Sequence, residues 1–217
     1  MSDTPAPPAD PGEFGIGLRY SLHPASDDFV DVILGAIAAT EEAGLTDGLT
    51  VQTDEVSTLV RATRAPAEQL LAAYLTRTIA EATHRMDGGH LVTHVLFSRG
   101  CPGEITCQLG DLVPPEISPV SLDPTGVQCV AQWSLYPLMD GGSNHGPHLA
   151  PIERAIEQAR SADVQVEAAN FSTRLRGDLA AVVATVTDAW AGVGTEIPHV
   201  VTHATISINS PTPKEQS

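Results

Sequence analysis

Apolar and polar residues alternate over residues 14–22, the first patterned stretch of the chain. Phe14, Ile16 and Leu18 are separated by residues without apolar side chains, and this period of two places successive side chains on opposite faces of a strand. In the residues that follow, apolar side chains recur with the spacing of an α-helix. This helix is expected to end near Gly44, because glycine commonly follows the last helical turn. The pattern therefore predicts a half-buried strand followed by an amphipathic helix.

The remainder of the first half of the chain predicts two more strands, a second helix and a closing strand. The strands are short runs rich in β-branched residues, and the second helix carries an apolar stripe. The predicted ranges are strands at 49–53 and 56–61, a helix at 65–86 and a strand at 90–98. The order β-α-β-β-α-β is that of the ferredoxin-like unit.

The same succession of motifs occurs a second time, which indicates an internal duplication. Three ordered matches are offset by 113, 115 and 109 residues, at Tyr20 with Trp133, Ser57 with Ser172, and His90 with His199. The second set of predicted elements covers 127–136, 150–162, 164–168, 170–176, 178–190 and 199–208. We therefore predict an α+β protein of tandem ferredoxin-like (βαββαβ) repeats with antiparallel sheets. Its predicted parts are a flexible tail at 1–12, repeats at 13–103 and 127–210, a linker at 104–126 and a second tail at 211–217.

In each repeat, the helices are expected to cover one face of the sheet, and the apolar positions of each strand then identify the covered side. On the third strand of each repeat, Val56 and Phe171 are expected to face the helices. The opposite face then receives hydroxyl, imidazole and guanidinium groups at matching positions of both repeats. These outward positions are predicted to be Ser21, Ser57, Arg61, His90, His94 and Ser98, with Ser134, Ser172, Arg176, His199, His203 and Ser207.

This outward polar surface has three interpretations. It can be a solvated sheet face, a face packed against a partner sheet, or a binding surface. The pairs His90 with His94 and His199 with His203 have a spacing that suits metal ligands, but no acidic residue accompanies them at fixed spacing. We therefore predict hydrogen-bonding histidines and no metal site.

Composition and charge narrow the classes of partner. Lys and Arg number 11 against 27 Asp and Glu, so the formal charge is −16, which repels nucleic acid and weakly favours a cationic ligand. No apolar stretch is long enough to cross a membrane, and residues 1–10 do not read as a signal peptide. The three cysteines, Cys101, Cys107 and Cys129, lack paired spacing. We therefore expect a cytoplasmic protein with reduced thiols and no membrane insertion.

The repeated motifs resemble those of the YkoF-like family. The residues that carry the resemblance are the segments 18–24, 27–29, 53–54, 57–61, 100–103, 134–137 and 209–211. The resemblance extends over the chain between the two tails. It implies tandem ferredoxin-like repeats, a homodimer, and binding of thiamin through its hydroxymethylpyrimidine part. It also implies a role in vitamin transport or salvage without catalysis and without a cofactor.

A flat aminopyrimidine requires an aromatic or apolar wall and a few hydrogen-bonding groups at its ring edge. The expected ligand contacts of the first repeat are Tyr20 as a wall and Ser21, Asp54, Ser57, Thr58 and His94 as polar groups. Those of the second repeat are Trp133 as the wall, with Ser134, Asn170, Ser172, Thr173 and His203. Tyr20 has the parity of a core residue, so a packing role is an equal alternative.

One difference between the repeats bears directly on this ligand. Thr53 and Asp54 of the first repeat are replaced by Ala168 and Ala169 in the second, so the two sites are expected to differ in affinity. The alternative function is a regulatory or scaffolding module that uses its open sheet face for protein–protein pairing. An enzyme acting on the pyrimidine ranks last, because no nucleophile, base or metal set converges in the sequence.

Overall fold

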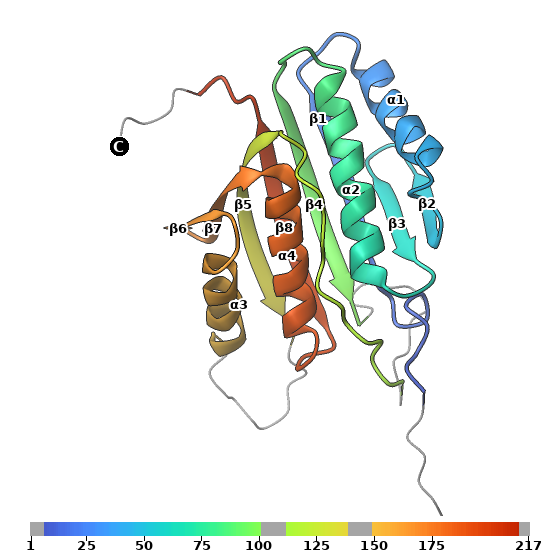
Figure 1. Cartoon of the computed structure of the whole chain (residues 1–217), viewed down its shortest axis with the longest axis vertical. Helices are drawn as coiled ribbons and strands as arrows, with labels where there is room; N and C mark the ends of the chain where they lie inside the picture. Colours follow the sequence, from blue (N-terminus) through green and yellow to red (C-terminus); the bar gives the residue numbers. More distant parts are fainter. Residues whose placement is uncertain (1–6, 101–111, 139–148, 213–217) are drawn as a thin grey trace, which may run out of the picture.

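The computed structural model describes residues 7–100, 112–138 and 149–212. In it the chain forms one antiparallel sheet of eight strands, in the order β2-β3-β1-β4-β8-β5-β7-β6, with the helices on one face (Figure 1). The first repeat contains β1 (Gly17–Pro24), α1 (Phe29–Glu42), β2 (Leu49–Thr53), β3 (Thr58–Ala62), α2 (Ala67–His84) and β4 (Leu91–Arg99). The second contains β5 (Gln128–Pro137), α3 (Ala150–Arg160), β6 (Gln165–Ala169), β7 (Ser172–Asp178), α4 (Leu179–Val193) and β8 (Val200–Ile208). The predicted α+β class and the two βαββαβ repeats are confirmed.

The helices are held on the sheet by apolar stripes. In α2, Leu71, Leu75 and Ile79 are fully buried and recur at helical spacing, and in α4 the buried Trp190 packs against Phe97 of β4 with ring centroids 5.3 Å apart. Figure 1 shows α2 and α4 side by side over the middle of the sheet. Helices α1 and α3 flank them toward the outer strands, so the core is continuous across both repeats.

The two repeats join through their last strands, β4 and β8, which pair antiparallel at the centre of the sheet. Val95 pairs with Ala204, and these two residues are separated by the same 109 positions that relate the repeats in this region. The pair Val95–Ala204 therefore marks a pseudo-two-fold axis at the middle of the β4–β8 junction. Side chains near this pair meet their own counterparts from the other repeat.

A buried ion pair lies at one end of this junction. The Arg99 guanidinium is fully buried, lies 3.2 Å from the Glu68 carboxylate, and stands over the rings of Phe14 and Trp190. Burial raises the pKa of Glu68 and lowers that of Arg99, although each charge favours the ionised form of the other. The symmetry-related position is held by Ile208, so this polar contact belongs to one end of the junction alone.

Parts of the predicted tails and linker, and the end of the predicted first repeat, lie outside the described residues, namely 1–6, 101–111 and 213–217, which include Cys101 and Cys107. Within the described part, the Ala9 N–H donates to the Val113 carbonyl, and the Val120 N–H donates to the Asp188 carboxylate on α4. Cys129 is buried, and burial raises the pKa of its thiol to about 12. No helix in the described ranges is long and apolar enough to span a lipid bilayer.

Candidate functional site

A notch opens at the edge of the first repeat's half of the sheet, where β3 is shorter than β1. The ladder between these strands ends at Tyr20 with Thr58, whereas β1 continues to Pro24. The β2–β3 turn and the start of α1 border the space that β3 leaves free, and the resulting pocket has a volume of about 470 Å³. Its lining consists of Tyr20, Ser21, Leu22, His23, Pro24, Ala25, Phe29, Ile33, Thr53, Asp54, Glu55, Val56, Ser57 and Thr58.

Asp54 is the charged group with the most contacts in this pocket. Its Oδ1 accepts hydrogen bonds from the backbone N–H groups of Val56 and Ser57, each at 2.9 Å, and its Oδ2 lies 3.0 Å from Arg19. The two backbone donors, and then Arg19, lower the pKa of Asp54 to about 2. The carboxylate is therefore ionised at any pH above about 4, and it stands at the mouth of the pocket as the negative partner of an ion pair with Arg19.

Arg19 was not among the predicted site residues, although it shares the outward parity of Ser21 on β1. Its guanidinium donates to Asp54 and, at 2.8 Å, to the Ser57 hydroxyl. These contacts join β1 to the β2–β3 turn and orient Asp54. The signal that the sequence offered is an arginine on the polar side of a strand. Its partners depend on the position of the β2–β3 turn, which the sequence pattern does not give.

Two apolar walls of the pocket are exposed side chains. Phe29 at the first turn of α1 and Val56 in the β2–β3 turn both lie in the lining, and Val56 is 80% exposed. The prediction that Val56 faces the helices is wrong, because β3 begins only at Thr58 and the alternation does not extend into the turn. Phe29 is thus the aromatic wall that the sequence analysis assigned to Tyr20.

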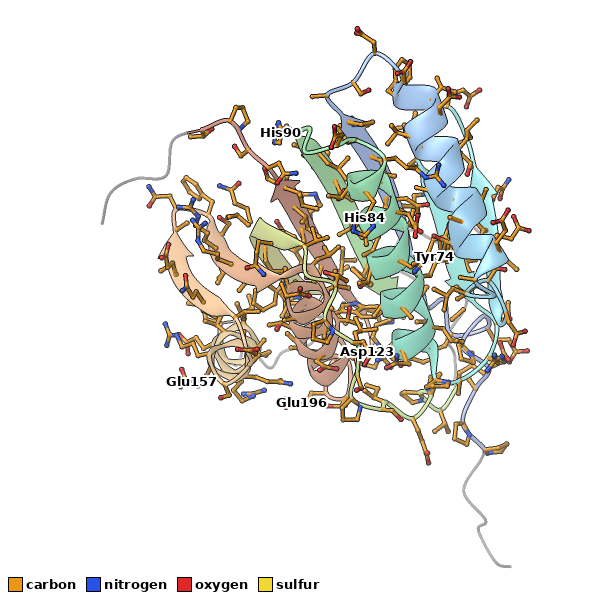
Figure 2. The ribbon with its side chains drawn as sticks, turned by 45° about the horizontal axis from the view of Figure 1, so that its top comes forward. Tyr74, His84, His90, Asp123, Glu157 and Glu196 are labelled. Atoms are coloured by element: carbon orange, nitrogen blue, oxygen red, sulfur yellow. The ribbon has the colours of Figure 1, made fainter. Side chains whose placement is uncertain are left out.

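Tyr20 and Thr58 form the inner end of the pocket and are buried. The hydroxyls of Tyr20 and Tyr74 lie 3.1 Å apart, and burial, with Tyr74 beside it, raises the pKa of Tyr20. Thr58 is 3.0 Å from the Thr53 hydroxyl. Tyr74 projects from α2 and is labelled in Figure 2. Both predicted residues therefore border the pocket from the core side, and packing is a large part of their role.

Ser21 connects the pocket to a row of histidines on the uncovered face. The Ser21 hydroxyl lies 3.0 Å from His23 Nε2, and the His23 ring contacts that of His94 edge to face with centroids 5.2 Å apart. His94 in turn stacks on His203, with 6.1 Å between centroids and an interplanar angle of 10°. Partial burial, and then His94, lowers the pKa of His203. His94 therefore lies beside the pocket without lining it.

The second repeat places its predicted residues in the corresponding positions, with different partners. Trp133 is buried and its indole N–H donates to Thr202 at 2.7 Å, and Thr173 is its cross-strand neighbour. The Ser134 hydroxyl donates to the Phe171 carbonyl at 3.3 Å, and Ser134 pairs with His203 across the strands. These contacts place Trp133 and Thr173 in the core and Ser134 on the uncovered face.

Ser172, Asn170 and Phe171 lie at the β6–β7 turn. Ser172 is half-buried, whereas Asn170 and Phe171 are exposed. Phe171 has a positive φ of 64°, so the prediction that Phe171 faces the helices is wrong for the same reason as for Val56. Residues 139–148 are outside the described residues. A hollow of about 440 Å³ elsewhere in this repeat, at the β6 and β7 ends near Asp163 and Arg176, contains none of the predicted contacts.

The uncovered face differs in charge from the protein as a whole. Arginines project from it on β1, β3 and β7, and the acids among its outward strand positions are Glu167 and Asp178, the latter occupied in capping α4. The outward arginines are Arg19, Arg61, Arg174 and Arg176. Among the described ranges, no three His, Cys, Asp or Glu side chains are placed to hold a metal ion.

A single sheet with one open face and a small, amphipathic notch at its edge offers a concave surface of the kind that small molecules occupy. The chain belongs to the YKOF-related family, whose model matches residues 15–104 and 128–213 and so covers both repeats.

The known proteins to which this chain is similar include one from Bacillus subtilis and one from Methanocaldococcus jannascii. One is a protein of Bacillus subtilis (strain 168) named "Putative HMP/thiamine-binding protein YkoF", which is 25% identical over 205 residues, or 92% of this chain and 93% of that protein. The other is the solved structure of hypothetical protein MJ1052 from Methanocaldococcus jannascii, with 27% identity, a TM-score of 0.33, and coverage of 42% of this chain and 84% of that one.

Proposed function

We propose that this protein binds thiamin, or its hydroxymethylpyrimidine part, without transforming it, and that each repeat provides one site. The observation that carries the proposal is the ionised Asp54 at the mouth of a pocket walled by Phe29 and Val56. An apolar slot of this kind accepts a flat ring, and a fixed carboxylate attracts a cation. The name of the Bacillus subtilis relative supports the same ligand class.

Titration calorimetry with thiamin and with hydroxymethylpyrimidine tests this proposal. We expect heat from both ligands, and we expect Asp54→Asn to weaken thiamin binding about 5- to 10-fold, the effect of losing one exposed charge contact. The neutral hydroxymethylpyrimidine should be affected less. Asp47→Asn is the matched control, because it removes the same charge from a residue that pairs with Arg64 outside the pocket. The absence of heat from both ligands would contradict the proposal.

The proposal extends to assembly and to cellular role. Two copies would pack through their uncovered sheet faces, where Leu96 is exposed and Val92, Val130 and Val201 are half-buried, and a cytoplasmic dimer would serve in vitamin transport or salvage. Sheet faces that carry such apolar residues are commonly covered by a second sheet. Sedimentation equilibrium should give a dimer that Leu96→Arg dissociates. A monomer at every concentration would contradict the dimer and favour pairing with a different protein.

A further inference from the structure

The backbone of β1 is incompletely paired beside the pocket. From Gly17 to Tyr20 it has a neighbouring strand on each side, β3 and β4. From Ser21 to Pro24 it pairs with β4 alone, since the ladder to β3 ends at Thr58. The pocket therefore lies against the free edge of a strand whose other edge is fixed.

The alternation of the ladder determines which backbone groups this edge presents. In antiparallel strands, the N–H and C=O of one residue point to the same side, and successive residues point to opposite sides. The Ile16 carbonyl accepts from the Ala62 N–H on the β3 side, and the Ala25 N–H donates to the His90 carbonyl on the β4 side. Residues with the parity of Ile16 therefore direct their backbone groups toward β3, and Leu22 is the first of them beyond the ladder.

The Leu22 N–H and C=O thus point into the notch. Among the described residues, no turn or loop hydrogen bond involves the Leu22 backbone, and its ladder to β3 has already ended. Two backbone donors of the turn, the N–H groups of Val56 and Ser57, are bonded to Asp54 Oδ1. The Leu22 side chain itself is buried in the core, so this residue faces the pocket through its main chain.

One donor and one acceptor on the same residue form a complementary pair for a planar heterocycle. A 4-aminopyrimidine presents a ring nitrogen that accepts a hydrogen bond and, next to it, an amino group that donates one. A ring bound in this position would pair with the edge of β1 where the β1–β3 ladder has ended. Phe29 and Val56 would be available to contact its faces.

We infer that the main chain of Leu22 recognises the amino edge of the pyrimidine, with the ring nitrogen accepting from the Leu22 N–H and the amino group donating to the Leu22 C=O. This inference rests on the proposed function and adds the ring edge that the site selects. Leu135 occupies the equivalent position 113 residues later, where the β5–β7 ladder has ended at Trp133 with Thr173. The same backbone N–H and C=O groups are therefore available in both repeats, independently of the side chains at the turns.

A ligand series tests the inference by calorimetry on the full chain. The 4-oxo analogue of hydroxymethylpyrimidine reverses the pattern, because its ring N–H donates and its carbonyl accepts. We expect it to bind at least about 30-fold more weakly than the amino compound. The Leu22 N–H would then face a ring N–H, and the Leu22 C=O would face a carbonyl. The analogue without the 2-methyl group keeps the amino edge and should lose less than about 10-fold.

The outcomes separate this inference from the proposed function. Equal binding of the amino and 4-oxo compounds would overturn recognition by Leu22 and leave vitamin binding intact, whereas no binding of thiamin or of either pyrimidine would overturn both. Replacing the Leu22 amide by an ester removes the N–H and keeps the side chain, and no ladder bond should be lost. It should weaken binding of hydroxymethylpyrimidine at least about 5-fold, and unchanged binding by this folded variant would overturn the inference.

Discussion

The turns β2–β3 and β6–β7 occupy equivalent places in the two repeats and are held differently. In the first repeat, Asp54 accepts two backbone N–H groups of its own turn and pairs with Arg19 on β1. In the second, Ala169 and Gln132 stand at the matching positions, and the Ser134 hydroxyl bonds the Phe171 carbonyl in the turn. The strand ladders are alike, so the difference between the repeats lies in the side chains at the turn.

The comparison separates two contributions to a binding site. The length difference between paired strands creates the notch and recurs in both repeats, because β1 and β5 each continue past the end of the neighbouring ladder. The charge at the mouth is a local property of a few turn residues. A duplicated protein can therefore keep the same strand pairing in both copies while the side chains at one turn change.

The largest effect is expected from the ion pair that distinguishes the two ends of the β4–β8 junction. Glu68→Ala leaves the Arg99 guanidinium buried without its carboxylate and should lower the free energy of unfolding by about 3–5 kcal/mol. Ile208→Val, at the equivalent end, should lower it by about 1 kcal/mol. Urea denaturation measures both. Similar small losses at the two ends would contradict the assigned role of the pair.

The next largest effect concerns the difference in thiamin affinity that we expect between the two proposed sites, and whether the turn side chains alone account for it. Ala169→Asp combined with Gln132→Arg transfers the charge arrangement of the first repeat to the second, and should raise thiamin affinity there about 5-fold, or about 1 kcal/mol. Calorimetry on an Asp54→Asn background, in which the first site is weakened, makes the second site easier to resolve. The matched control is Ala168→Asp combined with Gln132→Arg, which adds the same two charges with the carboxylate one residue away. Equal gains in both variants would indicate nonspecific attraction.

A smaller effect concerns the backbone of the two turns. Phe171 is exposed at a φ of 64°, a region that costs L-residues about 1–2 kcal/mol, so Phe171→Gly should stabilise the fold by about 0.5–1 kcal/mol. Val56, at the equivalent turn, does not have a positive φ, and Val56→Gly should destabilise by about 0.5–1 kcal/mol. Opposite signs in urea denaturation support the comparison, and equal signs contradict it.

The smallest effect concerns the stacked pair His94 and His203. Because the pKa of His203 is lowered by burial and by His94, the folded state favours its neutral form, and its contribution to stability is lost as the pH falls below about 6.5. NMR titration should show the pKa of His203 rising toward its ordinary value in His94→Gln while remaining below it, because burial persists. His23→Gln is the control, since His23 contacts the His94 ring. A fall in the pKa of His203 in the His94→Gln variant would contradict the effect assigned to His94.

The elements of the fold were predictable because most segments carry an uninterrupted period. Alternation over β1 and the apolar stripe of α2 place both elements within a few residues of their observed bounds. Because the motifs of the first repeat recur, the duplication also predicted the elements of the second repeat. The pairing of β4 with β8 was not predictable, because alternation identifies which residues share a face and contains no information about which strand lies alongside.

The site was predicted in part, with the errors concentrated at the turns. Asp54, Ser57 and Ser21, which the sequence analysis named as ligand contacts, line the pocket. Phe29 and Leu22 also line it and were not among the predicted contacts, because the pocket arises where β3 ends and a hydrophobicity pattern does not fix that end within two residues. Asp54 followed by Ser57 is a turn-forming pattern, and it could have shown that Val56 does not belong to the strand.

The central β4–β8 junction has a consequence for how the two halves can change. A lone βαββαβ unit with a free β4 edge could form the same sheet by pairing with an identical unit, but every substitution would then appear at both ends. With the halves in one polypeptide, a substitution at one notch leaves the other as it was. Covalent fusion therefore allows the turn residues at the two ends of the sheet to diverge independently, while the central β4–β8 pairing is kept.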